Sequence, residues 1–157
     1  MRQDTLVFLL KPETEEILLA MKKRGFGEGK FNGVGGKVAP GEAIEAGAVR
    51  EAHEEIGVEI EPMNLEKVAE LQFSFQGKPD WSIHCHTFIC RTWKGLPRES
   101  DEMAPQWFPI SGIPYERMWI DDKYWLPLVL EGWKLDARFH FNPDGSEILS
   151  KSIVRIE

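Results

Sequence analysis

The chain has 157 residues, 42% hydrophobic and 29% charged, which is enough for one domain with a sizeable core. Its net charge of −7 argues against a polymeric nucleic-acid partner held by phosphate contacts. It still permits one nucleotide, bound through a metal and a few local cations. There is no apolar run near the roughly 20 residues of a membrane span, and no basic-then-apolar signal pattern. We therefore expect a single domain over residues 1–157 that does not associate with a membrane.

The first half of the chain predicts two strands, a glycine-rich loop and a helix. Apolar residues indicate strands at 5–10 and 17–23. The loop at 24–36 carries six glycines, so its backbone can approach a ligand closely. The helix should begin after Gly41 and end at Gly57. Its apolar stripe, at a spacing of four residues, consists of Ile44, Ala48 and Ala52.

The second half predicts five strands and one further helix. The strands are residues 65–76, 81–93, 106–110, 135–141 and 147–156. The helix is residues 123–130, and we expect Pro127 near its first turn, where a missing N–H is tolerated. Mixed strands with two separated helices favour the α+β class.

The two cysteines, Cys85 and Cys90, have an odd spacing that would point them to opposite faces of one strand. A disulfide between them is then not expected. Few cysteines and no bridge suggest a reducing compartment, so we expect the protein in the cytoplasm.

Three carboxylates, Glu51, Glu54 and Glu55, fall within little more than one helical turn. Like charges at this spacing repel by about 0.2–0.5 kcal/mol per pair. A bound cation would relieve that repulsion, and carboxylate oxygens suit Mg²⁺. The alternative is an exposed acidic helix face with no ligand.

Residues 36–58, GKVAPGEAIEAGAVREAHEEIGV, resemble the Nudix box, the signature of hydrolases that cleave a nucleoside diphosphate linked to another group. Glu42 follows Gly36 after five residues, and Arg50 follows Glu42 after seven. The resemblance implies a mixed β-sheet sandwiched between helices and a Mg²⁺ cofactor, for which Mn²⁺ could substitute. Arg50 would orient the carboxylates; its alternative role is a surface pair with Glu54. The metal ligands that the resemblance implies are Gly35, Glu51, Glu54, Glu55 and Glu102.

Four further segments extend the resemblance along nearly the whole chain: 21–27, 31–37, 100–108 and 118–125. They resemble the mammalian MutT homologues, the Nudix branch that hydrolyses oxidised purine nucleoside triphosphates such as 8-oxo-dGTP to the monophosphate. Related substrates would be 2-hydroxy-dATP and 8-oxo-dATP. Lys37 is positioned to reach phosphate oxygens. The base-pocket residues that this branch implies are Thr5, Lys22, Phe26, Asn32, Phe73, Trp119, Asp121, Asp122 and Trp125.

Several of these side chains suit a purine on chemical grounds. Trp119 can stack on a flat ring, and the Asn32 amide carries both a donor and an acceptor. Near an apolar pocket, Asp121 or Asp122 can be kept protonated, so that the pair offers one donor and one acceptor. The alternatives are a core or surface role for Trp119 and a helix N-cap for the two aspartates.

Other functions remain open from the sequence alone. The enzyme could act on ADP-ribose or a dinucleoside polyphosphate, or the chain could be a non-catalytic nucleotide-binding module or a repair protein for duplex DNA. His84 and His86 would share a strand face, but with no third ligand nearby we expect packing or surface roles. We expect a small nucleotide as the only partner and a monomeric protein.

Overall fold

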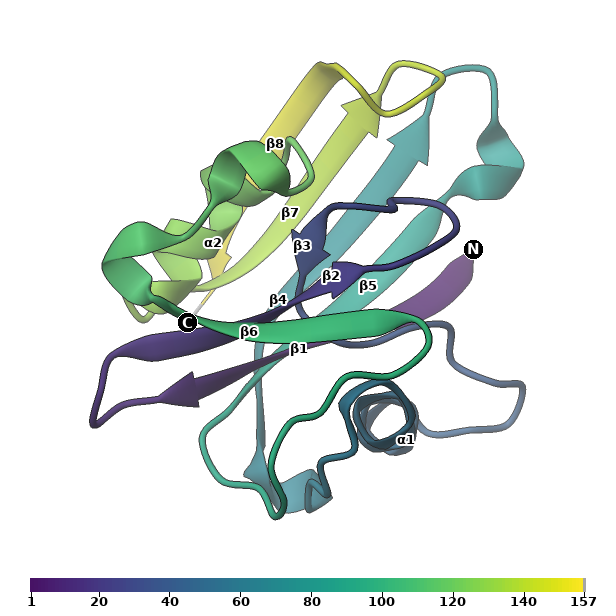
Figure 1. Ribbon diagram of the computed structural model, residues 1–157. Coiled ribbons are helices and arrows are strands. Elements are labelled where there is room, and N and C mark those ends of the chain that lie inside the picture. The colour runs from purple at the N-terminus through teal and green to yellow at the C-terminus, as the bar shows by residue number, and fades with distance from the viewer. Residues whose placement is uncertain (157) are drawn as a thin grey trace.

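The computed structural model describes residues 1–156, which form a mixed eight-stranded β-sheet with two α-helices (Figure 1). This confirms the α+β class. The helices are α1 (Ile44–Ile56) and α2 (Asp122–Leu130), and neither is long and apolar enough to cross a membrane. The strands are β1 (Arg2–Lys11), β2 (Glu16–Lys22), β3 (Phe31–Asn32), β4 (Leu65–Phe75), β5 (Ile83–Cys90), β6 (Met103–Pro109), β7 (Lys134–Phe141) and β8 (Ile148–Ile156).

Strand β1 lies inside the sheet, between β2 and β5, and the strand order is β3-β2-β1-β5-β4-β7-β8. β1 and β3 share one edge of β2, and β6 pairs with the other edge. The β1–β5 and β4–β7 pairs are parallel, and the remaining pairs are antiparallel. Residues 5–10 are all buried, as expected for an apolar run covered on both faces of the sheet.

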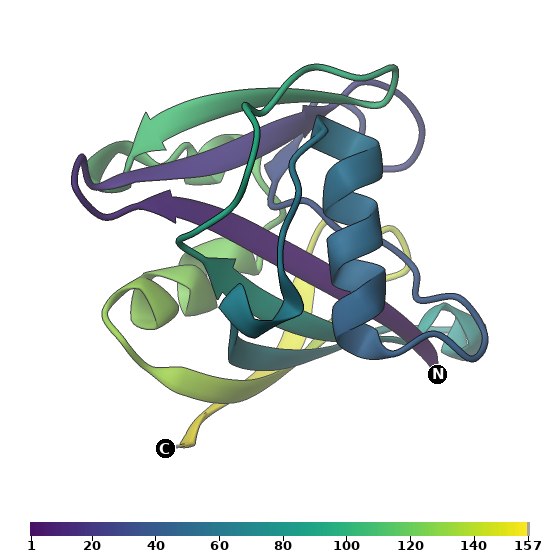
Figure 2. The same ribbon diagram turned by 90° about the horizontal axis from the view of Figure 1, so that it is seen from below.

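Two hydrophobic clusters lie on opposite faces of β1. Leu6 and Phe8 belong to the cluster that includes α2, whereas Val7 and Leu9 belong to the cluster beneath α1. The small side chains of the α1 stripe let this helix pack closely against β1, and Figure 2 shows it lying across that side of the sheet. Gly57, in the left-handed conformation, ends α1 as predicted.

The structure separates the two cysteines as predicted. Cys85 lies in the α2-side cluster and Cys90 in the α1-side cluster, and both are free thiols. Their positions follow from the alternation of side chains along β5.

Several predicted positions were wrong, and β1 begins at Arg2, three residues before its predicted start. β6 begins at Met103, because an edge strand that pairs only with β2 tolerates Pro105. β5 is shorter than predicted, since Trp81 lies in a 3₁₀ turn before it and the chain leaves the sheet after Cys90. Pro127 lies in the second turn of α2 rather than the first. The carbonyl it leaves unpaired would be that of Lys123, an exposed residue that water can reach.

Candidate active site

Arg50 forms hydrogen bonds both to the loop that precedes α1 and to the carboxylates on α1. Its Nε and Nη2 donate to the two carboxylate oxygens of Glu42 at 2.8 and 2.9 Å. Its Nη1 donates to Glu51 at 2.9 Å and to Glu54 at 3.2 Å, and its Nη2 also reaches the Lys37 carbonyl. These hydrogen bonds lower the pKa of Glu42 to about 2. Arg50 is therefore more than a partner for Glu54, because it fixes the carboxylates relative to the preceding loop.

Glu42 is the residue that sequence reasoning did not place in the site. Its carboxylate also accepts a hydrogen bond from the Ala39 N–H at 3.0 Å, so it closes the loop before the helix. The available signal was its fixed spacing from Gly36 and Arg50.

Glu51 and Glu55 are partly buried beside one another. Burial raises the pKa of Glu55 to about 7, although the Gly35 N–H donates to its Oε1 at 2.9 Å and opposes the shift. Burial also raises the pKa of Glu51, against the effect of Arg50. Glu102 contributes negative charge to both, and its own carboxylate lies 3.8 Å from Arg24. The cluster thus holds more negative charge than its neighbouring cations neutralise.

Gly35 and Gly36 let the loop pass between β1 and these carboxylates. A Cβ on Gly35 would lie 1.9 Å from the Thr5 carbonyl oxygen, and one on Gly36 would lie 2.8 Å from the Glu51 carboxyl carbon. The backbone contact excludes any side chain at Gly35, whereas a side chain at Gly36 would push the Glu51 carboxylate out of place. The donors gathered here are all oxygens, and together with the uncompensated charge they fit a hard divalent cation.

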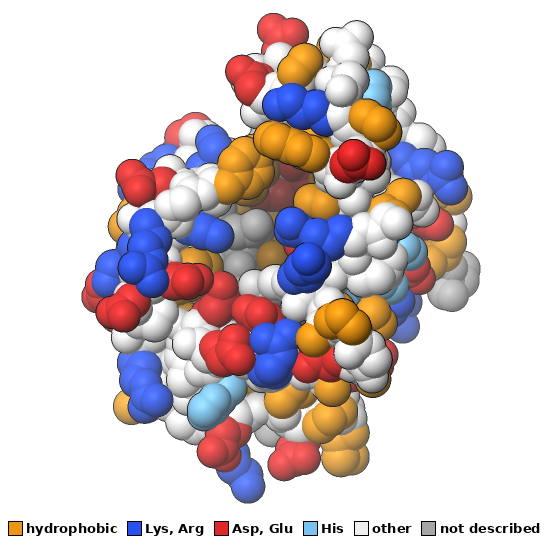
Figure 3. Space-filling view, turned by 90° about the vertical axis from the view of Figure 1, so that its right-hand side faces the viewer, with side chains coloured by type: hydrophobic (Ala, Val, Ile, Leu, Met, Phe, Trp, Pro, Cys, Tyr) orange, Lys and Arg blue, Asp and Glu red, His pale blue; other side chains and the backbone are white. Residues whose placement is uncertain are grey.

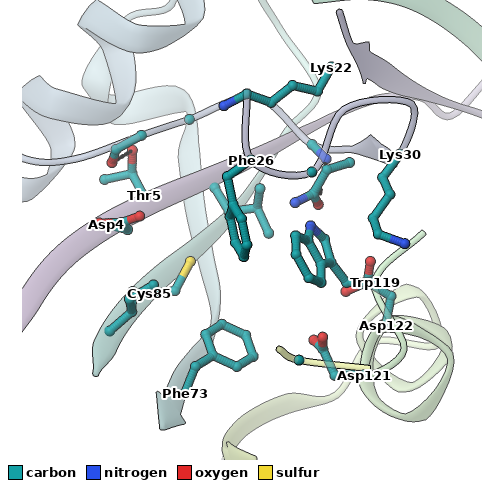
Figure 4. A pocket seen from close by; sticks show the side chains of 18 of the residues that line it. Asp4, Thr5, Lys22, Phe26, Lys30, Phe73, Cys85, Trp119, Asp121 and Asp122 are labelled. Carbon is teal, nitrogen blue, oxygen red and sulfur yellow. Dashed lines mark hydrogen bonds between the residues drawn. The ribbon is translucent and has the colours of Figure 1, made fainter. Parts of the chain in front are cut away.

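A cavity of about 270 Å³ opens next to this cluster, with Glu55 on its wall (Figure 4). In space-filling view, a hollow lies between basic side chains, with acidic side chains grouped below it (Figure 3). Lys37 does not line the cavity; it is exposed on the loop before α1. The predicted pocket residues that do line it are Thr5, Lys22, Phe26, Asn32, Phe73, Trp119, Asp121, Asp122 and Trp125.

Aromatic rings form one side of the cavity mouth. Phe26 and Trp119 lie 5.1 Å apart between ring centroids, tilted by 37°. Phe26 is 63% exposed, so its ring is held by few neighbours. The Lys30 ammonium lies 5.3 Å from the Trp119 ring centre. These rings offer a flat surface near a cation, which suits a purine nucleotide.

Asp121 and Asp122 lie at the buried end of the cavity, each 3% exposed. The Trp125 indole Nε1 donates to Asp121 Oδ2 at 2.9 Å, which partly opposes the rise that burial causes in the pKa of Asp121. Burial and the Asp121 charge raise the pKa of Asp122 well above its usual range. Asp122 is therefore the carboxyl that keeps its proton. Among residues 1–156, its Oδ2 is the one buried side-chain N or O atom with no hydrogen-bond partner.

Neither aspartate caps α2 through its side chain. Asp121 occupies the N-cap position but makes no side-chain capping bond, because its carboxylate turns toward Trp125. Trp125 itself has no exposed surface and packs edge-on against Phe8. It therefore positions Asp121 from the core as well as closing the cavity wall.

Some cavity residues were not identified from the sequence. Arg2 and Asp4 form a two-bond ion pair at the cavity edge, with both distances 2.7 Å. Ile83 and Cys85 lie on the cavity-facing side of β5. Alternation along β1 and β5 could have grouped them only once the parallel pairing of those two strands was known.

A family model described as NUDIX domain matches residues 1–129, and the chain therefore belongs to the Nudix hydrolase family. Members of this family use divalent metal ions. The chain is 45% identical over 153 residues to an "Oxidized purine nucleoside triphosphate hydrolase" of Mus musculus, covering 98% of this chain and 94% of that protein. A protein of Danio rerio with the same name is 45% identical over 137 residues, covering 87% and 85%.

A solved structure supports the same fold. A MutT protein from Bacillus halodurans superposes with a TM-score of 0.83 at 25% sequence identity, covering 98% of this chain and 97% of that one. The "8-oxo-dGTP diphosphatase" of Escherichia coli (strain K12) is 27% identical over 108 residues, 68% of this chain and 80% of that protein.

Proposed function

We propose that this protein hydrolyses oxidised purine nucleoside triphosphates, such as 8-oxo-dGTP, to the nucleoside monophosphate and pyrophosphate, and so removes damaged nucleotides from the pool. The observation that carries the proposal is the buried Asp121–Asp122 pair at the end of the cavity, with an unpartnered Asp122 oxygen. An oxidised purine differs from the normal base in its donor and acceptor pattern. A protonated and an ionised carboxyl side by side can read such a pattern.

One end of the cavity would bind the base and the other the phosphates. Trp119 and Phe26 would hold the base between them and the cavity wall, while Asn32 offers its amide to a base edge. Lys22 lines the cavity on the side of Glu55, and Lys30 lies by Trp119. Both lysines would attract the phosphates into the channel that leads to the carboxylates.

Glu51, Glu54, Glu55 and Glu102, with the Gly35 carbonyl, would hold Mg²⁺ or Mn²⁺. When bound, such an ion neutralises phosphate charge and lowers the pKa of a water molecule. In the hydrolysis, a water oxygen forms a bond to phosphorus as the P–O bond that bridges the α- and β-phosphates breaks, and the products are the monophosphate and pyrophosphate. Arg50 fixes Glu51 and Glu54 through the hydrogen bonds described above, so it positions the ligands rather than the substrate.

Product analysis tests this proposal. Purified protein is incubated with 8-oxo-dGTP, 2-hydroxy-dATP, 8-oxo-dATP, dGTP, ADP-ribose and a dinucleoside polyphosphate, with Mg²⁺, with Mn²⁺ or with EDTA, and the products are separated by ion exchange. We expect Mg²⁺-dependent release of monophosphate and pyrophosphate, fastest from an oxidised purine. Preference for ADP-ribose or a dinucleoside polyphosphate would instead assign another Nudix substrate. No turnover of any of them would favour a non-catalytic binding module.

We further propose that the protein works as a monomer in the cytoplasm, as one domain over residues 1–157, on free nucleotides rather than on nucleic-acid polymers. The net charge of −7 supports this, because phosphate contacts with a polymer would need a basic surface. The two buried free thiols suit a reducing compartment. Light scattering after size exclusion tests the oligomeric state, and a gel shift with damaged duplex DNA tests the polymer.

A further inference from the structure

A second group of metal-ligating side chains lies on the sheet face opposite the nucleotide cavity. In the antiparallel β4–β5 pair, Glu70 is directly opposite His86 and Gln72 is opposite His84. Their neighbours in sequence, Leu71 and Cys85, face the α2-side core. Glu70, His84 and His86 therefore project from the face on which α1 packs, and one ligand atom from each lies within 4.8 Å of the others. This corrects the expectation that the two histidines have no third ligand nearby.

The hydrogen bonds around the two imidazoles settle the role of each nitrogen. His86 Nε2 lies 2.7 Å from Oε1, the side-chain amide oxygen of Gln3, which can only accept, so this nitrogen carries the proton. His86 Nδ1 then has the free lone pair, which the Lys67 ammonium contacts at 2.9 Å. His84 Nε2 donates to Glu70 Oε1 at 2.7 Å, and the two rings stack 4.4 Å apart.

A cation already occupies part of this group. The Lys67 ammonium donates to His86 Nδ1 at 2.9 Å and lies 3.3 Å from Glu70 Oε2. It thus sits between the imidazole lone pair and the carboxylate, where a metal ion would have to bind. The Lys67 side chain is 40% exposed, so it can swing into solvent when another cation takes its place.

We propose that Glu70, His84 and His86 form a binding site for a transition-metal ion such as Zn²⁺, distinct from the oxygen-rich site of the hydrolase reaction, with Lys67 as its competitor. Two imidazoles and one carboxylate are ligands that zinc accepts, whereas Mg²⁺ prefers oxygen alone. Water would complete the coordination at this partly exposed position. The Gln3 side-chain amide oxygen accepts from His86 Nε2 and so orients the ring, as a supporting hydrogen bond does for metal-bound histidines.

The site needs only a small rearrangement. Two ligands of a tetrahedral zinc ion lie about 3.3 Å apart, so His84 Nε2 and Glu70 must separate by a fraction of an ångström. Binding through His84 Nε2 also requires the ring proton to move from Nε2 to Nδ1. A bound ion would link β4 to β5, whose other faces carry Phe73, Ile83 and Cys85 of the cavity. We therefore expect it to stabilise the sheet rather than to take part in hydrolysis.

Calorimetric titration of the whole chain with Zn²⁺, in excess Mg²⁺ to occupy the oxygen-rich site, tests this proposal. We expect one zinc site in wild type, with affinity reduced at least tenfold in His84→Ala and His86→Ala. Lys67→Met should bind zinc more tightly, because the competing ammonium is gone. The matched control is His140→Asn: His140 bonds Ser74 elsewhere on the sheet and should not alter the affinity. At a hundredfold excess of zinc over Kd, the Tm should rise by about 5 °C or more in wild type and not in the histidine variants.

Two results would overturn the proposal. One is zinc affinity that survives both histidine changes but falls in Glu54→Gln or Glu55→Gln, since the ion would then belong to the carboxylate cluster. The other is unchanged affinity in Lys67→Met, a variant that alters only a partly exposed side chain and so stays informative if a histidine variant fails to fold. Neither result decides whether the protein hydrolyses nucleotides, which the product analysis tests separately.

Discussion

Neighbouring carboxylates stand at both ends of the nucleotide cavity, yet their surroundings give them different chemistry. At the α1 end, Glu51 and Glu54 share the Arg50 guanidinium, and the cluster is open to ions. At the α2 end, Asp121 and Asp122 are 3% exposed, and their one polar side-chain partner outside the pair is the neutral Trp125 indole. At the first end the pKa of Glu55 rises only to about 7, so the group can still ionise, whereas at the second end the pKa of Asp122 rises well above its usual range.

The difference shows that burial and partners, rather than residue type, decide what a carboxyl group can do. A group of carboxylates that is open to ions can bind a cation, whereas a buried pair with no cation beside it keeps a proton. One end is therefore suited to phosphates and metal, and the other to the edge of a base.

The largest effect is expected from the α1 end. Glu54→Gln or Glu55→Gln should lower kcat for 8-oxo-dGTP by about a thousandfold or more, because the reaction depends on charge neutralisation at the phosphates. Pyrophosphate release with saturating Mg²⁺ measures this. The control is Glu45→Gln, an exposed change on the same helix. Near-normal turnover in both Glu54→Gln and Glu55→Gln would contradict the assignment of these residues as metal ligands. The stability of the metal-free protein should not fall in either variant.

At the α2 end the effect should be smaller and confined to the base. Asp121→Asn and Asp122→Asn disturb the donor–acceptor pattern, and a buried polar mismatch costs about 1–3 kcal/mol. We expect kcat/KM for 8-oxo-dGTP to fall roughly ten- to a hundredfold, with the Mg²⁺ requirement unchanged. The measurement is the ratio of 8-oxo-dGTP to dGTP turnover. If that ratio stays constant in both variants, the aspartates serve the helix and not the substrate.

Arg50→Lys tests whether the guanidinium is needed to position the carboxylates that would bind the metal at the α1 end. A lysine cannot fork to both oxygens of Glu42 while also reaching Glu51. The Mg²⁺ concentration for half-maximal activity should rise about tenfold, with most of kcat restored at high Mg²⁺. Base preference should not change. Arg91→Lys, whose partner is Glu66, is the control. An unchanged Mg²⁺ requirement would show that the guanidinium fork is dispensable.

The smallest effect is a pH dependence of stability in the metal-free protein. The pKa of Glu55 is about 7 in the fold against 4.5 as the ordinary value, so the folded state holds a proton that the unfolded chain has lost. Stability is then full below about pH 4.5 and falls as the pH rises to about 7. We expect a loss on the order of 1 kcal/mol, since residual exposure weakens the effect.

Urea unfolding in EDTA from pH 5 to 8 measures that loss. The pKa of Asp122 is also raised in the fold and contributes a pH dependence of the same sign. Wild type must therefore be compared with Glu55→Gln, in which the contribution of Glu55 is absent. Parallel stability curves for the two proteins would contradict the assignment. Added Mg²⁺ should reduce the pH dependence of wild type.

Features that depend on residues close together in the chain were predicted correctly from the sequence. The α1 stripe and its end at Gly57 followed from helical spacing, and the separation of Cys85 and Cys90 followed from strand alternation. What it missed depends on contacts between distant segments. The short β3 forms only because β2 offers it an edge, and Pro105 is accepted in β6 only because nothing pairs beyond it.

The candidate site divides in the same way. The glutamate cluster could be predicted from the spacing within one helix. The hydrogen bonds from Arg50 to Glu42 could not, because they depend on how the loop before the helix folds. The neutral state of Asp122 needed its burial, which no dipeptide reveals. Glu70 lies 14 residues before His84 in the chain. It comes next to the two histidines because of the register in which β4 pairs with β5.

The parallel pairing of β1 with β5 has a consequence for how the protein is made. Arg2 lies opposite Ile83, and Thr5 opposite His86, about 80 residues later in the chain. Contacts of such separation close slowly and late in folding. While a ribosome is still adding β4 and β5, the strand that carries Asp4 and Thr5 has no partner on that edge. The nascent chain therefore exposes an unpaired apolar strand edge, which is open to aggregation or to capture by a chaperone until β5 emerges.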